Sequence, residues 1–241
     1  MTLLGARVKI RRKRFMKIIE SEKSEKYLGY RLYIPDNMSD ELPLLIYLHG
    51  AGERGVRRAQ LEHLERNGVP RIIKEGREID AIVLCPQCPE MFVWNNIVVD
   101  LKKLIDNIIE QYRIKKDRIC ITGSSMGGYG TWEMGMTFPD FFSAIAPVSG
   151  GGMEWRAQKL VNTPVWAYHG ADDDAVKPIN SKMMVDKIQE AGGSAKFCLL
   201  QGFGHGDGIY EAYKNQNLIE WILKQRRTNF DIVEEVASSW F

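Results

Sequence analysis

The sequence has few of the residues from which disulfide frameworks and metal centres are built. Its 241 residues include four cysteines and four histidines. Cys85 and Cys88 have the C-x-x-C spacing of redox and zinc motifs, but prolines flank them and no second pair of ligands exists. Cys120 and Cys198 lie in apolar, strand-like runs and are interpreted as buried thiols. We therefore expect no metal ion, no disulfide and no other cofactor.

Long apolar stretches and export signals are also missing. No run approaches the roughly 20 apolar residues of a membrane-spanning helix, and the N-terminus has no short apolar core of a secretory signal. Internal repeats and low-complexity stretches do not occur. With 44% hydrophobic and 27% charged residues, the composition is that of a globular domain, which we expect to be cytoplasmic and to make no membrane contact.

Acidic residues do not occur before Glu20, whereas six basic residues lie between Arg7 and Arg14. The net charge of the whole chain is +2 at pH 7, so without these six the remainder carries −4. A basic segment can bind nucleic acid, but the mildly acidic body favours another interpretation. We expect residues 1–14 to be an extension outside the core, and we expect no nucleic-acid partner.

The rest of the chain alternates apolar runs with stretches of helical periodicity, which predicts βα units around a largely parallel sheet. One α/β domain of about eight strands is expected over residues 15–228. Residues 229–241 are expected to form a tail that packs on the body or on a partner subunit, so the protein would be a monomer or a homodimer. Strands are expected near 15–20, 27–34, 43–48, 80–84, 118–122, 143–148, 164–168 and 195–200. Helices are expected near 57–66, 97–112, 127–138, 178–191 and 210–226.

The most informative motif is a G-x-S-x-G at residues 123–127. The apolar run 117–122 before it suits a buried strand, and 127–138 after it has the pattern of a helix that ends before Pro139. A sharp strand-to-helix turn of this kind exposes the hydroxyl of its serine above the sheet. The motif alone is common, and its placement is what marks Ser125 as the candidate nucleophile.

A serine at neutral pH needs a general base, and only four histidines are available. A G-x-S-x-G at a strand-to-helix turn predicts that the catalytic residues follow in the chain order serine, acid, histidine. Each of them should lie at the end of a later strand. His49 and His63 precede Ser125 and are out of order, and His169 ends an apolar run where local packing explains it better. His205, in a glycine-rich loop after the last predicted strand, is therefore predicted to be the base.

The orienting acid should lie between Ser125 and His205, where three aspartates stand together. Consecutive loop carboxylates point in different directions, so one of the three should face inward. Asp173 is favoured by its position, with Asp172 and Asp174 as alternatives. The other two would be solvated loop charges or a cap for the following helix.

Two backbone N–H groups are expected to stabilise the oxyanion that develops during attack by the serine. One belongs to Met126, directly after the nucleophile. The second is expected in the loop 49–55, whose small residues allow the backbone to approach the reacting group closely. Ala51 is the favoured donor, and Gly52 is the alternative.

Five segments extend this pattern, and they resemble one branch of the serine hydrolases. They are LHGAGERG at 48–55, CPQCP at 85–89 followed by Trp94, DRICITGSSMGGYGTWEMGMTFPDFFSAIAPVSGGG at 117–152, HGADDDAV at 169–176 and GFGHG at 202–206. Together they resemble the serine esterases of the α/β-hydrolases that include feruloyl esterase-like and polyhydroxybutyrate depolymerase-like proteins. The resemblance covers about residues 26–226. It implies an α/β-hydrolase fold, a triad of Ser125, Asp173 and His205, and oxyanion donors at Ala51 and Met126.

The space above the site is expected to be open. Only residues 149–163 separate the sixth predicted strand from the seventh, which is too short for a large cap domain. Trp94, Gly52 and Trp155 are predicted to bind substrate, with Tyr129 as a further candidate. A packing role is the competing interpretation for each aromatic residue.

These observations predict a serine carboxylesterase that hydrolyses short-chain acyl or aryl (feruloyl-type) esters of small molecules through an acyl-enzyme. A serine peptidase or thioesterase is the main alternative, because the triad does not determine the leaving group. A non-catalytic binding protein is disfavoured because no triad residue is missing. A dienelactone hydrolase-like enzyme is disfavoured because Ser125 stands where such enzymes usually have cysteine.

Overall fold

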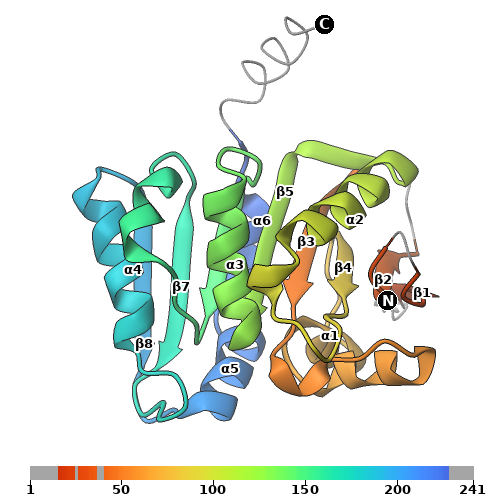
Figure 1. The fold of residues 1–241 in the computed structure, drawn as a ribbon, viewed down its shortest axis with the longest axis horizontal. Coiled ribbons are helices and arrows are strands. Elements are labelled where there is room, and N and C mark those ends of the chain that lie inside the picture. The colour runs from red at the N-terminus through yellow and green to blue at the C-terminus, as the bar shows by residue number, and fades with distance from the viewer. Residues whose placement is uncertain (1–15, 25–26, 37–40, 228–241) are drawn as a thin grey trace, which may run out of the picture.

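The computed structural model describes residues 16–24, 27–36 and 41–227 of the chain (Figure 1). The predicted basic extension and the predicted tail at 229–241 lie outside these described residues. A single sheet crosses the described part of the molecule, and helices cover both of its faces. No helix within these ranges is both long and apolar enough to cross a membrane.

The sheet has eight strands in the order β1-β2-β4-β3-β5-β6-β7-β8. The pairs β1–β2 and β2–β4 are antiparallel, and every other pair is parallel. The predicted architecture, a mostly parallel sheet of eight strands without a large cap, is confirmed. The strands are β1 (Met16–Ser21), β2 (Tyr30–Pro35), β3 (Leu42–Leu48), β4 (Ile82–Pro86), β5 (Ile114–Ser124), β6 (Ala144–Val148), β7 (Val165–Gly170) and β8 (Ala195–Leu200).

Six α-helices and four short 3₁₀ helices connect the described strands. The α-helices are α1 (Gly68–Lys74), α2 (Val98–Gln111), α3 (Met126–Thr137), α4 (Ile179–Glu190), α5 (His205–Lys214) and α6 (Leu218–Lys224). The 3₁₀ helices are η1 (Ala51–Glu53), η2 (Arg58–Arg66), η3 (Trp94–Asn96) and η4 (Glu154–Leu160).

Two helical segments differ from the prediction. The helix expected near 210–226 is divided into α5 and α6. The first of these ends at Lys214, and the side-chain amides of Asn215 and Gln216, which follow it, donate hydrogen bonds to the Glu211 carboxylate. Helix α1 was not predicted at all. It begins at Gly68, whose φ is +59°, and holds Pro70 in its first turn, where a missing N–H costs no hydrogen bond.

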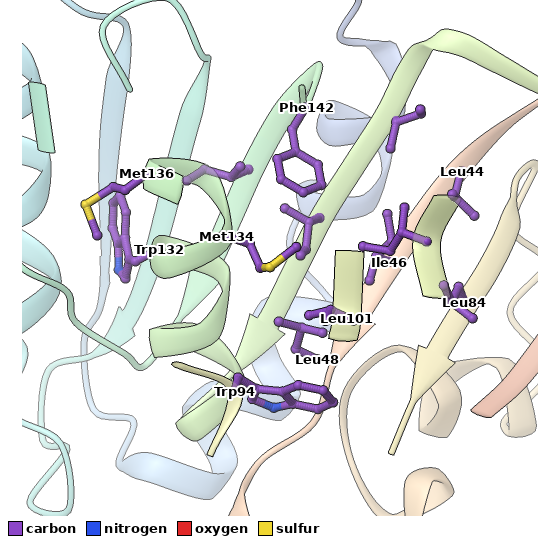
Figure 2. Packing of buried hydrophobic residues seen from close by; sticks show 14 of the residues in the cluster. Leu44, Ile46, Leu48, Leu84, Trp94, Leu101, Trp132, Met134, Met136 and Phe142 are labelled. Carbon is purple, nitrogen blue, oxygen red and sulfur yellow. The ribbon is translucent and has the colours of Figure 1, made fainter. Parts of the chain in front are cut away.

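Two apolar clusters bury the two faces of the sheet. On one face, α2 and α3 pack with Trp94 against alternate side chains of β3, β4 and β5 (Figure 2), and α4 covers β7 and β8. On the other face, α1, α5 and α6 pack around Tyr47 and Tyr213, whose rings meet edge to face. The helix predicted near 97–112 is α2, and its apolar residues form part of this core, because Leu101 and Leu104 are fully buried.

The start of α3 lies unusually close to the end of β3. A Cβ placed on Gly127 would lie 1.9 Å from the backbone oxygen of Leu48, so only glycine allows this approach. Since the carboxyl ends of the parallel strands meet at one edge of the sheet, this contact places the turn after β5 beside the loop after β3.

Candidate active site

Ser125 occupies the turn between β5 and α3 in a strained backbone conformation. Its φ is +55° and its ψ is −119°, which is outside the regions that L-residues ordinarily adopt. Its N–H donates to the carbonyl oxygen of Val148 at 2.9 Å, which ties the turn to the neighbouring strand β6. Strain of this size persists where the surrounding structure enforces it, and it commonly marks a functional position.

The structure brings three predicted residues together from the ends of three strands. His205 Nε2 lies 2.9 Å from Ser125 Oγ, and His205 Nδ1 lies 2.7 Å from Asp173 Oδ2. Ser125 follows β5, Asp173 lies in the loop after β7, and His205 is the first residue of α5 after β8. The side chain of His205 keeps 25% of its surface exposed, so the pair with Ser125 opens toward solvent.

Asp173 is the one aspartate of the triplet that faces inward. It is 2% exposed, whereas Asp172 and Asp174 are exposed. Its Oδ1 accepts the backbone N–H groups of Ala175 and Val176 at 3.1 and 2.8 Å. Burial alone would raise the pKa of the Asp173 carboxyl, but the hydrogen bonds from His205 and from the Val176 N–H lower it overall. The carboxylate is therefore ionised at neutral pH.

The two predicted oxyanion donors lie on either side of the serine. Met126 begins α3, and Ala51 begins η1 in the loop after β3. This loop reaches the nucleophile, because a Cβ on Gly50 would lie 3.6 Å from the Cβ of Ser125. Among the described residues, neither the Met126 N–H nor the Ala51 N–H donates a hydrogen bond. Both donors are thus available to a ligand.

Buried side chains that the sequence prediction had left without a role hold the loop after β3. His49 is fully buried, and its Nε2 accepts the Cys88 N–H at 2.9 Å. Its Nδ1 therefore carries the proton that is donated to the Gly50 carbonyl oxygen at 2.5 Å. Gln87 Nε2 donates to the carbonyl oxygen of Glu53 at 2.9 Å. These bonds fix the backbone around the proposed oxyanion donor.

Two predicted substrate-binding residues do not lie where substrate could contact them. Trp94 is fully buried; its Nε1 donates to the His49 carbonyl oxygen at 2.9 Å, and its ring packs on the His49 imidazole. Trp94 therefore packs against the loop after β3 and supports it. Trp155 is 73% exposed, but it borders a groove with Lys187 and Glu190 near the C-terminal end of α4, whereas the serine lies at the edge from which α4 begins.

The third predicted binding residue and the further aromatic candidate remain near the site. Gly52 lies in the exposed η1, and a Cβ placed on it would meet no atom within 4 Å. Tyr129 lies one turn into α3, where its N–H donates to the Ser125 carbonyl oxygen at 3.1 Å. The space beside Gly52 is therefore open to a bound group, whereas Tyr129 is half-buried.

Acidification is expected to destabilise the protein through His49. Burial lowers the pKa of this imidazole to about 4, whereas an unfolded histidine titrates near 6.5. Between these values the unfolded state binds a proton that the folded state does not. The free energy of unfolding should therefore fall as the pH drops from about 6.5 to about 4, reaching a loss of about 2 kcal/mol near pH 5. Urea unfolding near pH 7 and near pH 5 measures this loss.

The control for this prediction is His49→Asn, which keeps a donor toward the Gly50 carbonyl oxygen. Burial lowers the pKa of His169 as well, so some acid destabilisation should remain in the variant. The measurement that tests His49 is the loss of unfolding free energy between pH 7 and pH 5, compared between the wild-type protein and His49→Asn. Equal pH dependence would show that His49 is not responsible.

Comparisons of sequence and structure relate the chain to known hydrolases. Residues 94–162 match the prolyl oligopeptidase family. The chain is 26% identical to poly(3-hydroxyalkanoate) depolymerase C of Paucimonas lemoignei over 134 residues, which are 49% of this chain and 30% of the relative. It is 26% identical to the bifunctional acetylxylan esterase/xylanase XynS20E of Neocallimastix patriciarum over 167 residues, 66% of this chain and 24% of the relative.

A solved structure gives the broadest of these matches. The crystal structure of a thermostable esterase has a TM-score of 0.73 and 30% identity, and the match covers 88% of this chain and 64% of that one. The α/β-hydrolase fold and the resemblance to serine esterases are thereby confirmed. The chain spans less than a third of the length of the two curated relatives.

Proposed function

We propose that this chain is a serine esterase that hydrolyses carboxylic esters through an acyl-enzyme on Ser125. The observation that carries the proposal is the continuous line of hydrogen bonds from Ser125 through His205 to Asp173. A strained serine, an imidazole and an ionised buried carboxylate in this order form the arrangement that activates a hydroxyl as a nucleophile.

We propose a catalytic role for each residue of this line. His205 Nε2 takes the proton from Ser125 Oγ as the oxygen attacks the ester carbonyl, and it then gives that proton to the leaving alcohol. The Asp173 carboxylate accepts the Nδ1–H of His205, which leaves Nε2 free to act as the base and stabilises the imidazolium that forms. Water activated by the same imidazole then releases the carboxylic acid from the serine.

The Met126 and Ala51 N–H groups are proposed to bind the oxyanion of the tetrahedral intermediate. One such donor contributes about 3–4 kcal/mol of transition-state stabilisation in enzymes of this kind. The buried contacts of His49, Trp94 and Gln87 fix the loop before substrate arrives, so little reorganisation is required when charge develops.

The proposed substrates are short-chain acyl or aryl esters, including feruloyl-type esters. Between β6 and β7 the chain forms only a loop and η4, so no large cap restricts the approach to Ser125. Relatives named as a depolymerase of a polyester and as an acetylxylan esterase act on ester bonds in bulky molecules, which supports an open ester site.

A peptidase or thioesterase is the second candidate function. The match of residues 94–162 to the prolyl oligopeptidase family favours the peptidase within this alternative. The same three side chains can attack an amide or a thioester, because the triad acts on the carbonyl and not on the leaving group.

A comparison of matched substrates tests the proposal. We expect p-nitrophenyl acetate and butyrate to be hydrolysed with a kcat/KM that falls toward octanoate and laurate, and methyl ferulate to be hydrolysed as well. For one acyl group, the ester should exceed the amide by at least about 100-fold in kcat/KM, equivalent to about 2.7 kcal/mol. Hydrolysis of amides or thioesters in preference to every ester, with labelling by a fluorophosphonate, would move the assignment to the second candidate.

A further inference from the structure

A second histidine lies against the carboxylate of Asp173. The side chain of His169, near the end of β7, is fully buried, and its Nε2 lies 3.3 Å from Asp173 Oδ2. This is the same oxygen that lies 2.7 Å from His205 Nδ1. His169 Nε2 also lies 2.8 Å from the carbonyl oxygen of Val176.

The surroundings of the His169 ring determine where its proton lies. Both neighbours of Nε2, the Val176 carbonyl oxygen and the ionised Asp173 carboxylate, can only accept a hydrogen bond. Nε2 must therefore carry a hydrogen. On the other side of the ring, Nδ1 lies 2.8 Å from Ser181 Oγ, which lies 2.6 Å from the Gly150 carbonyl oxygen. The Ser181 hydroxyl has one hydrogen, which it can donate either to the Gly150 carbonyl oxygen or to Nδ1.

The carboxylate is thus surrounded by donors on both oxygens. Oδ1 receives the N–H groups of Ala175 and Val176, and Oδ2 receives the Nδ1–H of His205 and lies 3.3 Å from His169 Nε2. A carboxylate held by three hydrogen bonds cannot rotate about its terminal bond without breaking several of them. Without the His169 donor, the Val176 carbonyl oxygen would lose its partner, and the loop segment whose N–H groups hold Oδ1 would be less firmly fixed.

We propose that His169 is a positioning residue whose Nε2–H, bonded to the Val176 carbonyl oxygen and lying against Oδ2, keeps Asp173 in the orientation that His205 requires. This inference rests on the proposed function, because it concerns the same hydrogen-bonded line. His169 is fully buried, so a bound substrate has no surface of its ring to touch. Its removal should therefore lower kcat and leave KM nearly unchanged.

Two amide variants separate the donor from the general packing of the ring. In His169→Gln the side-chain NH₂ reaches the position of Nε2, so the donor toward Asp173 and Val176 is retained. In His169→Asn the shorter side chain replaces only the Nδ1 side. We expect His169→Asn to lose about 10- to 100-fold in kcat on p-nitrophenyl butyrate, the usual effect of losing a hydrogen bond to a charged group, with KM within about twofold. His169→Gln should lose less than about fivefold. Equal losses in the two variants, or a loss that appears in KM, would overturn the proposal.

A spectroscopic measurement on the wild-type protein is independent of activity and of the folding of the variants. The ¹⁵N chemical shifts of histidine rings distinguish an imidazole protonated at Nε2 from one protonated at Nδ1. We expect the signal of His169, identified by its loss in His169→Gln or His169→Asn, to show a protonated Nε2. A ring protonated at Nδ1 alone would overturn the proposal. Absence of both ester hydrolysis and fluorophosphonate labelling would instead count against the proposed function, while this measurement would still decide the role of the ring.

Discussion

Replacing Ser125 by alanine is expected to lower kcat for ester hydrolysis by at least about 10⁴-fold while the protein remains folded. No other hydroxyl can take the place of Oγ, because His205 Nε2 lies 2.9 Å from this atom and the backbone of the turn is fixed by the bond to Val148. The activity that remains should come from water attacking a substrate bound at the oxyanion donors. Steady-state hydrolysis of p-nitrophenyl butyrate measures the change, with thermal unfolding as the check on folding.

The neighbouring Ser124 provides a matched control. Its hydroxyl is buried 2.9 Å from the Tyr47 hydroxyl, beneath the sheet edge and away from His205. Ser124→Ala should cost about 1 kcal/mol of stability through this lost hydrogen bond and leave kcat within a few-fold of wild type. Esterase activity at the wild-type level in Ser125→Ala would refute the acyl-enzyme mechanism.

The fold could be predicted from the sequence because its strands are short apolar runs separated by amphipathic helices. The helix at 97–112 was predictable because its apolar residues repeat at helical spacing and face the sheet. Helix α1 has no such stripe, and its first turn contains both Gly68 and Pro70, which usually indicate a break. Its position depends on close contact between Gly68 and the Tyr47 side chain, a contact between residues that are distant in sequence.

The predicted triad depended on chain order and on the small number of histidines. These arguments predicted Ser125 and His205, and position in the loop favoured Asp173, but the chemistry of three adjacent aspartates is the same and could not support that choice. The choice depends on backbone torsions in the loop after β7, which turn one carboxylate inward and leave Asp172 and Asp174 exposed. No local sequence signal reports these torsions.

The structural roles of Trp94 and His49 could not be predicted by considering each residue separately. An aromatic residue in a loop near the site can either line the pocket or support it, and composition does not distinguish the two. One signal does exist in the sequence: Gly130 in α3 leaves room for the indole, since a Cβ there would lie 2.5 Å from the Trp94 Cβ. His49 was excluded as the base by its position in the chain, and this exclusion concealed its contacts within the loop after β3.

Replacing Asp173 by asparagine is expected to lower kcat by about 10⁴-fold, through the tautomer of His205. The N–H groups of Ala175 and Val176 both point at the Oδ1 position, so the one oxygen of the asparagine amide must occupy it. The NH₂ group of the asparagine then donates to His205 Nδ1. Because Nδ1 must accept this hydrogen bond, it cannot carry a proton, and the imidazole proton lies on Nε2. A protonated Nε2 cannot take the proton of Ser125.

The two neighbouring aspartates make the test specific. Asp172→Asn and Asp174→Asn remove the same charge from exposed positions on the same loop, so general electrostatic effects of the triplet should appear in all three variants. We expect both controls to keep kcat on p-nitrophenyl butyrate within about twofold, because exposed charges are screened by solvent and salt. The ¹⁵N signal of His205 should change from a protonated Nδ1 to a protonated Nε2 only in Asp173→Asn. A large loss of kcat in either control, with little loss in Asp173→Asn, would assign the acid to another member of the triplet and contradict the geometry described above.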